Sequence, residues 1–246
     1  MAIATIINPH RFGSADSLPS DADLVLWLAA YKESYTNGDR IATLTDWSGN
    51  GRDFTQSNAS NKPRFDTGVL NSQPGYFFDG SAYFASATAF MSGDADVMAV
   101  LKIPGSQSGN GFWKFDGSGN ASHCLFAGAI YTAMGGASRF SYAPATMTSG
   151  YIHHVQAKAG TSNWICYENG NTAKSTQTNT QSWSGGASPV HLIGASSDQA
   201  NGSTQTNWFH GWLMELRIWN KVLSSSERNE VLAAWNTRYG LSYTSF

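Results

Sequence analysis

The sequence is poor in charged residues and has no long apolar run. Asp, Glu, Lys and Arg make up 13% of its 246 residues, and the formal net charge is −2. The low charge argues against nucleic acid as a partner, because phosphate backbones call for a dense stripe of Lys and Arg. No apolar stretch approaches the roughly 20 residues of a membrane-spanning helix. We therefore expect no nucleic-acid binding and no membrane insertion.

Cysteine is scarce as well. The two residues, Cys124 and Cys166, lie in apolar runs, and two are too few for a disulfide framework. Neither has the neighbours expected of an activated nucleophile. We expect buried free thiols, with a single bridge between the two as the alternative.

Aromatic and small polar residues are abundant. The chain holds 9 Trp, 10 Tyr and 13 Phe, and Gly, Ser, Thr, Asn and Ala fill much of the rest. This profile is typical of a β sandwich with long polar loops, and the length suits one such domain. Part of the aromatic content must build the core, so we expect Trp27, Phe77, Trp164, Trp212 and Ile218 to be packed there.

Short strand-like runs separated by turns continue along the chain and predict an all-β fold. Asn169-Gly170 between two such runs predicts a tight hairpin, because the turn needs positive φ at two positions. Segments 171–188 and 196–207 are strongly polar and are expected to be surface loops. The predicted strands are Leu24–Ala29, Gly75–Phe78, Asp96–Ile103, Gly111–Phe115, His123–Ala127, Arg139–Tyr142, Tyr151–Lys158, Asn163–Glu168, Val190–Ile193 and Gly211–Trp219.

The last predicted strand alternates between two faces. Trp212, Met214, Leu216 and Ile218 are expected on one face, and Leu213, Glu215, Arg217 and Trp219 on the other. Glu215 and Arg217 are then neighbours, which predicts a partly buried ion pair.

A helix is predicted directly after this strand. Ser224 followed by Glu227 forms a capping-box pattern, so the helix should begin there, and Gly240 is placed to end it. One face should be buried, because apolar residues recur at helical spacing. These are Val231, Leu232, Trp235 and Tyr239.

These segments together resemble the laminin-G-like, concanavalin-A-like lectin jelly rolls. The resemblance covers about residues 21–240 and implies a sandwich of two antiparallel sheets with one short C-terminal helix, so we assign the domain to residues 21–246. The fold hosts many functions, so the resemblance by itself implies architecture only. The segments that carry it, in the order of the family, are 24–30 with 46–52, 75–80, 151–155 with 167–170, and 211–228.

Residues 1–20 lie before the jelly-roll pattern and lack the basic start of a signal peptide. This favours a protein that is made in the cytoplasm and assembled into a particle over an exported lectin. The segment resembles the short arms of phage tail, fibre and capsid-decoration proteins. A frayed terminus or an extra edge strand is the alternative. The expected docking residues are Asn8, Pro9, Arg11 and Phe12.

The two polar loops offer a place for a sugar. They combine amide and hydroxyl groups with an indole, and sugars are held by stacking on a ring with neutral hydrogen bonds around it. The candidate carbohydrate-binding residues are Trp183, Asn201, Asn207 and Trp208. The alternative is a solvated loop whose Trp packs back onto the sandwich.

Catalysis is not expected. Glucanases of this fold carry two carboxylates in a Glu-x-Asp-x-x-Glu strand, and no glutamate here fits that pattern. Arg217 should keep Glu215 ionised and unfit as an acid. The adjacent His153 and His154 point to opposite faces of a strand, so they cannot share a metal ion without a bulge.

No cofactor is expected, although calcium deserves a test. Some relatives of the fold hold this ion on loop oxygens. Asp94 with Asp96, or Asp116 with Asn120, could supply such ligands, but neither pair completes a calcium loop.

The sequence therefore favours a non-catalytic structural or adhesive protein of a phage particle: a homo-oligomer at the virion surface, in the capsid decoration, tail or fibre. Its partners would be other virion proteins and host-surface glycans. One alternative is a free, extracellular carbohydrate-binding lectin module. The second alternative is a polysaccharide-degrading enzyme.

Overall fold

A computed structural model describes most of the chain beyond the first 21 residues. The described residues are 22–86, 88, 93–105, 110–115, 123–126, 128–133, 139–157, 162–179, 191–196, 205 and 207–246. The proposed docking arm, with Asn8, Pro9, Arg11 and Phe12, lies outside them. No helix in the described part is long and apolar enough to cross a bilayer.

Two sheets of eight strands each form the body of the domain, and their paired strands run antiparallel. This confirms the predicted all-β, jelly-roll sandwich. Sheet 1 has the order β14 (Thr172–Asn179), β13 (Ser162–Glu168), β12 (Tyr151–Ala157), β7 (Ala95–Lys102), β16 (His210–Trp219), β5 (Gln73–Asp79) and β4 (Arg64–Leu70), with β1 (Leu24–Ala29) also paired with β16. Sheet 2 has the order β11 (Arg139–Tyr142), β10 (Ala129–Ala133), β9 (His123–Phe126), β8 (Asn110–Lys114), β15 (His191–Ile193), β6 (Phe84–Ser86), β3 (Phe54–Thr55) and β2 (Thr43–Leu44).

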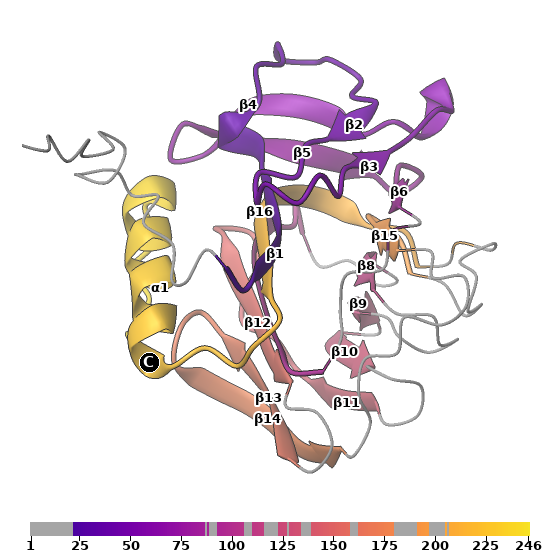
Figure 1. The fold of residues 1–246 in the computed structure, drawn as a ribbon. Coiled ribbons are helices and arrows are strands. Elements are labelled where there is room, and N and C mark those ends of the chain that lie inside the picture. The colour runs from indigo at the N-terminus through magenta and orange to yellow at the C-terminus, as the bar shows by residue number, and fades with distance from the viewer. Residues whose placement is uncertain are drawn as a thin grey trace, which may run out of the picture.

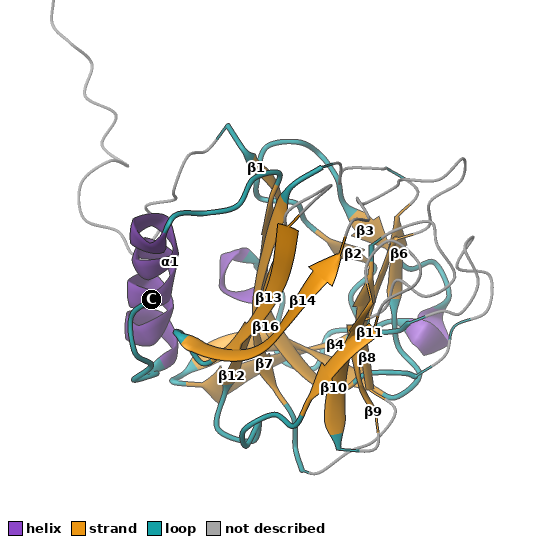
Figure 2. Ribbon diagram, turned by 90° about the horizontal axis from the view of Figure 1, so that it is seen from below, coloured by secondary structure: helices purple, strands orange, loops and turns teal. Residues whose placement is uncertain are grey.

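The two sheets and the helix form three layers (Figures 1 and 2). The main core lies between the sheets. The second apolar cluster lies between the outer face of sheet 1 and the helix α1 (Ser225–Tyr239), and it includes Met98, Trp219 and Trp235. Large side chains of the main core that are almost fully buried are Phe54, Tyr76, Phe78, Phe84, Phe112 and Trp113.

The predicted boundaries of α1 are confirmed. The Ser224 side chain accepts a hydrogen bond from the Glu227 backbone, and the Glu227 side chain accepts one in return from the Ser224 N–H. Gly240 ends the helix in the left-handed region, with φ of 63°. The buried face carries the predicted Val231, Leu232, Trp235 and Tyr239.

The prediction of a surface loop over 171–188 is wrong in its first half. Thr172–Asn179 forms β14, the edge strand that continues the Asn169-Gly170 hairpin. Polarity does not prevent an edge strand from forming, because an antiparallel strand at the rim of a sheet can face water. Thr also favours extended backbone because it is β-branched.

β16 lies at the centre of sheet 1, and the alternation of its side chains between the two faces is interrupted partway along the strand. It pairs with β7 on one side; on the other, its first residues pair with β5 and its last residues with β1. A bulge between Leu213 and Glu215 shifts the register. Leu213 therefore shares the inner core with Leu216 and Ile218, whereas Met214 lies in the outer cluster with Trp219.

The predicted grouping of Trp212 and Met214 with Leu216 and Ile218 is consequently wrong. A bulge places one extra residue on one strand, and strict alternation fails from that point on. Among the other aromatic residues expected in the core, Trp27 is buried in the outer cluster. Phe77 is half-buried and belongs to neither cluster, so its predicted place in the core is wrong. The Trp164 side chain lies outside the described part.

Cys166 is a free, buried thiol, as predicted. Its Sγ lies 3.8 Å from Oγ1 of Thr132, and burial raises its pKa above the ordinary value of a thiol. The Cys124 side chain lies outside the described residues.

Candidate functional site

Glu215 is a structural anchor at the base of α1. Its side chain and that of Arg217 are 0% exposed, so the predicted ion pair is confirmed and is more deeply buried than expected. One carboxylate oxygen accepts from Nε of Arg217 at 2.6 Å and from Nε1 of Trp27 at 2.9 Å. The other accepts from the Tyr239 hydroxyl at 2.8 Å and from Arg238 at 3.2 Å. These donors occupy both oxygens, and the group is closed to a substrate.

Asp96, one of the calcium candidates, is also fully buried and occupied. One oxygen lies against the ring nitrogen Nε2 of His154, and the other accepts from Gln156 and from the Leu223 backbone, both at 3.0 Å. Asp96 therefore ties the loop that leads into α1 to sheet 1. Its partner candidate Asp94 belongs to no group of three potential metal ligands within the described residues. The other pair, Asp116 and Asn120, lies outside the described residues.

The neighbouring histidines point to opposite faces, as predicted. His154 lies in the outer layer beside Asp96, whereas Nδ1 of His153 lies 3.0 Å from the Tyr142 hydroxyl in the inner core. Burial lowers the pKa of His153 to about 3, so this ring stays neutral at ordinary pH. The pair cannot hold one metal ion together.

Two of the predicted carbohydrate-binding residues are described. Trp208 is half-buried against Tyr83, with ring centroids 5.5 Å apart, and Asn207 donates a hydrogen bond to the Ser196 hydroxyl at 3.2 Å. Trp208 therefore packs back onto the sandwich to a large extent. Trp183 and Asn201 lie outside the described residues.

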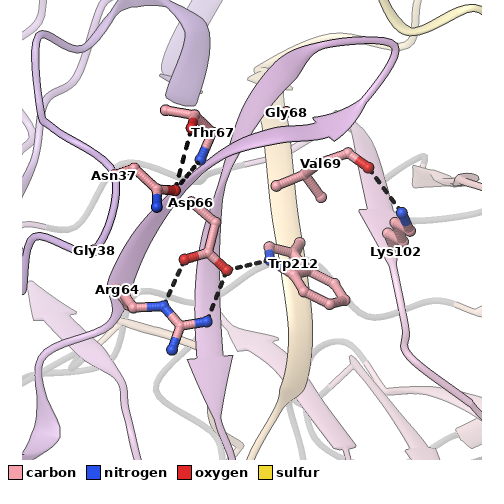
Figure 3. Close-up of a pocket in the computed structure, with 9 residues that line it drawn as sticks. All are labelled: Asn37, Gly38, Arg64, Asp66, Thr67, Gly68, Val69, Lys102 and Trp212. Carbon is pink, nitrogen blue, oxygen red and sulfur yellow. Dashed lines mark hydrogen bonds and ion pairs between the residues drawn. The ribbon is translucent and has the colours of Figure 1, made fainter.

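A pocket surrounds Trp212 on the outer face of sheet 1 (Figure 3). Its volume is about 590 Å³. We call it the Trp212 pocket. The described residues that line it are Asn37, Gly38, Arg64, Asp66, Thr67, Gly68, Val69, Lys102 and Trp212.

The rim of the Trp212 pocket is built by an irregular stretch of β4. Pairing with β5 shifts between Asp66 and Leu70, and Gly68 adopts a φ of 69° that suits glycine. The backbone N–H of Thr67 donates to Oδ1 of Asn37 at 2.8 Å, and the carbonyl of Val69 accepts from Lys102 at 2.7 Å. The irregular stretch thus turns main-chain groups toward side chains of the pocket.

The indole of Trp212 is held in one orientation by an ion pair. Its Nε1 donates to Asp66 at 2.9 Å, and Arg64 grips the same carboxylate through Nε at 2.5 Å and Nη2 at 2.9 Å (Figure 3). Burial raises the pKa of Asp66, but the hydrogen bonds from Arg64 and Trp212 outweigh it and hold the pKa below its ordinary value. Trp212 is therefore a preorganised, half-buried ring at the wall of an open pocket.

Four cross-strand neighbours form a row, and three of them, Lys102, Trp212 and Arg64, line the pocket. Lys102, Trp212, Phe77 and Arg64 are directly paired across β7, β16, β5 and β4. The Lys102 ammonium lies 5.6 Å from the Trp212 ring centroid, Trp212 lies 4.9 Å from Phe77, and the Arg64 guanidinium lies 4.6 Å from Phe77. Two aromatic rings are thus flanked by a cation on each side.

The sequence pattern alone does not reveal this site. Strict alternation placed Trp212 in the core, and the bulge in β16 turns it outward. A usable signal was present in Arg64-Phe65-Asp66, where a buried aromatic residue separates two polar ones on a strand. That alternation indicates a strand whose outer face carries an ion pair.

The chain belongs to the concanavalin A-like lectin/glucanases superfamily, whose family model matches residues 87–227, more than half of the chain. No curated protein matches the chain significantly.

Several solved structures share the fold at low sequence identity. One of them is domain 4 of AbnA, a GH43 extracellular arabinanase from Geobacillus stearothermophilus, solved in complex with arabinotriose. It has a TM-score of 0.61 and 14% identity, and the match covers 85% of this chain and 98% of that one. Trypanosoma rangeli sialidase has a TM-score of 0.53 and 13% identity over 89% of this chain, which spans 34% of the sialidase. The botulinum neurotoxin type G receptor binding domain has a TM-score of 0.52 and 10% identity, covering 86% of this chain and 51% of that one. At these identities the likeness shows the fold alone.

Proposed function

We propose that this domain is a non-catalytic glycan-binding module and that the Trp212 pocket is its binding site. The observation that carries the proposal is the half-buried indole of Trp212, held by Asp66 at the wall of an open pocket of about 590 Å³. A fixed aromatic ring loses little conformational entropy when a sugar stacks on it. Asn37, Thr67 and Arg64 surround the ring with amide, hydroxyl and guanidinium groups.

A non-catalytic role is supported by the state of the carboxylates. Glycoside hydrolysis needs two carboxyl groups that face a sugar across a gap of about 5–10 Å. Asp66 is the carboxylate among the described residues that line the pocket, and Arg64 holds it. Glu215 is enclosed beneath α1. Release of new reducing ends from a panel of polysaccharides would instead favour the alternative of a degrading enzyme.

The binding test compares tryptophans in different places. Binding of an oligosaccharide panel is measured by titration calorimetry for the wild type, Trp212→Ala, Trp208→Ala and Trp47→Ala. Trp47 is the matched control because it is exposed, at 37%, and does not line the pocket. We expect Trp212→Ala to weaken binding at least about tenfold and Trp47→Ala to leave it unchanged.

Other patterns of loss would point elsewhere. Loss in Trp208→Ala but not in Trp212→Ala would move the site to the neighbourhood of Tyr83, where a second pocket of about 460 Å³ is lined by Thr43, Thr55 and Gln56. Equal binding by all variants would refute both sites. Thermal unfolding of each variant separates lost binding from lost folding.

We further propose the setting expected from the sequence, a phage particle in which the domain serves in the capsid decoration, tail or fibre. Its support is compositional: low charge, many aromatic residues and polar segments rich in Asn and Thr. Light scattering on the purified full chain should give the mass of an oligomer, a whole multiple of the 26.5 kDa chain. A lone monomer with no affinity for particles would favour the free lectin module.

A further inference from the structure

Lys102 is the group in the Trp212 pocket that the proposed function leaves unused. It is the last residue of β7 and lies directly opposite Trp212 in register. Its ammonium carries three donors, and one of them goes to the Val69 carbonyl at 2.7 Å. Among the residues that the structure describes, no carboxylate pairs with it.

The charges lining the pocket do not balance. Arg64 and Lys102 supply two positive charges and Asp66 one negative charge, so one positive charge remains. Asp66 is committed to Arg64 and Trp212, with Nε of Arg64 at 2.5 Å. The unbalanced charge is therefore that of Lys102. It is half-buried, where a missing counterion costs more than on an open surface.

The position of Lys102 beside the Trp212 ring favours a ligand group that is negatively charged and accepts hydrogen bonds. Its Nζ lies 5.6 Å from the centroid of the Trp212 ring. A sugar that stacks on the indole brings the substituents at its rim toward this ammonium. Two donors of Nζ remain for such a substituent, and an anionic oxygen satisfies both the charge and the hydrogen bonds.

From this geometry we propose that the Trp212 pocket selects carboxylated saccharides, with the sugar ring on Trp212 and its carboxylate paired with Lys102. This rests on the proposed function, because it refines the ligand of the same site. Arg64 lies three strand spacings from Lys102, roughly 14 Å. Its Nη1 is left over from the grip on Asp66 and is available to a second acidic residue of a longer chain.

The test uses pairs of ligands that differ at the carboxyl group. Oligogalacturonate and its methyl ester share one backbone, and sialyllactose and its methyl ester supply a second comparison. Affinities are measured by calorimetry at low and high salt for the wild type, Lys102→Gln, Lys102→Arg and Lys62→Gln. Lys62 is the matched control, because its loss removes the same charge outside the described lining of the pocket.

The wild type should bind the acidic member of a pair on the order of tenfold more tightly than the neutral one. The preference should vanish in Lys102→Gln and at high salt, and persist in Lys102→Arg and Lys62→Gln. Equal affinity for both members, or a preference untouched by Lys102→Gln, overturns the selection of acids while the glycan site stands. Binding of none of these ligands, neutral ones included, overturns the site together with its selectivity.

Discussion

The outer face of sheet 1 carries the same three chemical groups twice, once covered and once open. Beneath α1, Trp27 and Arg217 both donate to Glu215. Beyond the helix, Trp212 and Arg64 both donate to Asp66. The covered Glu215 and Arg217 are 0% exposed, whereas the open Asp66 and Arg64 are 14% and 41% exposed.

We call each set of indole, guanidinium and carboxylate a triad, one covered by α1 and one open. The two triads differ in their access to water. A charge beneath α1 has no water to solvate it, so Tyr239 and Arg238 complete the shell of Glu215. Water reaches Asp66 and Arg64, and the guanidinium keeps donors for other groups. The same groups thus hold the fold together where the helix covers them and can contact a ligand where it does not.

The largest expected effect is that of Glu215→Ala. This substitution leaves the buried Arg217 without its carboxylate partner. The free energy of unfolding, measured in urea, should therefore fall by about 3–5 kcal/mol. Glu230→Ala, at an exposed position of α1, is the control and should stay within about 0.5 kcal/mol of the wild type. A loss as small as that of the control would mean that burial does not separate the two triads.

Asp66→Ala should have a small effect on stability and a large one on binding. A solvent-accessible ion pair contributes up to about 1 kcal/mol, so the urea midpoint should move little. Sugar affinity should fall on the order of tenfold, because the Trp212 ring is no longer held. Asp79→Ala breaks a comparable ion pair, with Arg40, outside the pocket and should leave binding intact. Unchanged affinity in Asp66→Ala would show that the ring needs no anchor.

The smallest expected effect is the response of the open triad to acid. The pKa of folded Asp66 lies below its ordinary value of 3.8, so its ion pair is fully stabilising above that value. The contribution is lost as the pH falls through the lowered pKa. In an NMR titration, the indole N–H resonance of Trp212 should shift over this pH range. The shift should be absent in Asp66→Asn. A transition centred above 3.8 would contradict the geometry of the pair.

Much of the fold could be predicted from local patterns. Ser224, Glu227 and Gly240 mark the helix by chemistry that acts within a few residues, and the structure bears out each role. The ion pair of Glu215 and Arg217 followed from their separation by two residues on a strand. Six strands were missed. β2, β3 and β6 are only two or three residues long, and the edge strand β14 is polar, so none of them shows an apolar pattern. β4 and β10 were missed as well.

The Trp212 pocket could not be found in the same way. Its residues come from β4, β7, β16 and the turn at Asn37 and Gly38, which are far apart in the sequence and meet in the folded sheet. The decisive feature is the register shift in β16, which depends on pairing with β7 and leaves no mark in the sequence of the strand itself. Trp208 was identified by its polar surroundings, but it packs against Tyr83.

The register shift in β16 also bears on how such a surface can arise. Along a regular strand, moving a whole set of side chains to the opposite face would require a substitution at every position of that set. One added residue between Leu213 and Glu215 moves every side chain on one side of the bulge to the opposite face of the sheet. The hydrophobic composition of the strand stays the same. A scaffold of this kind can therefore gain or lose a recognition surface by a single codon insertion or deletion.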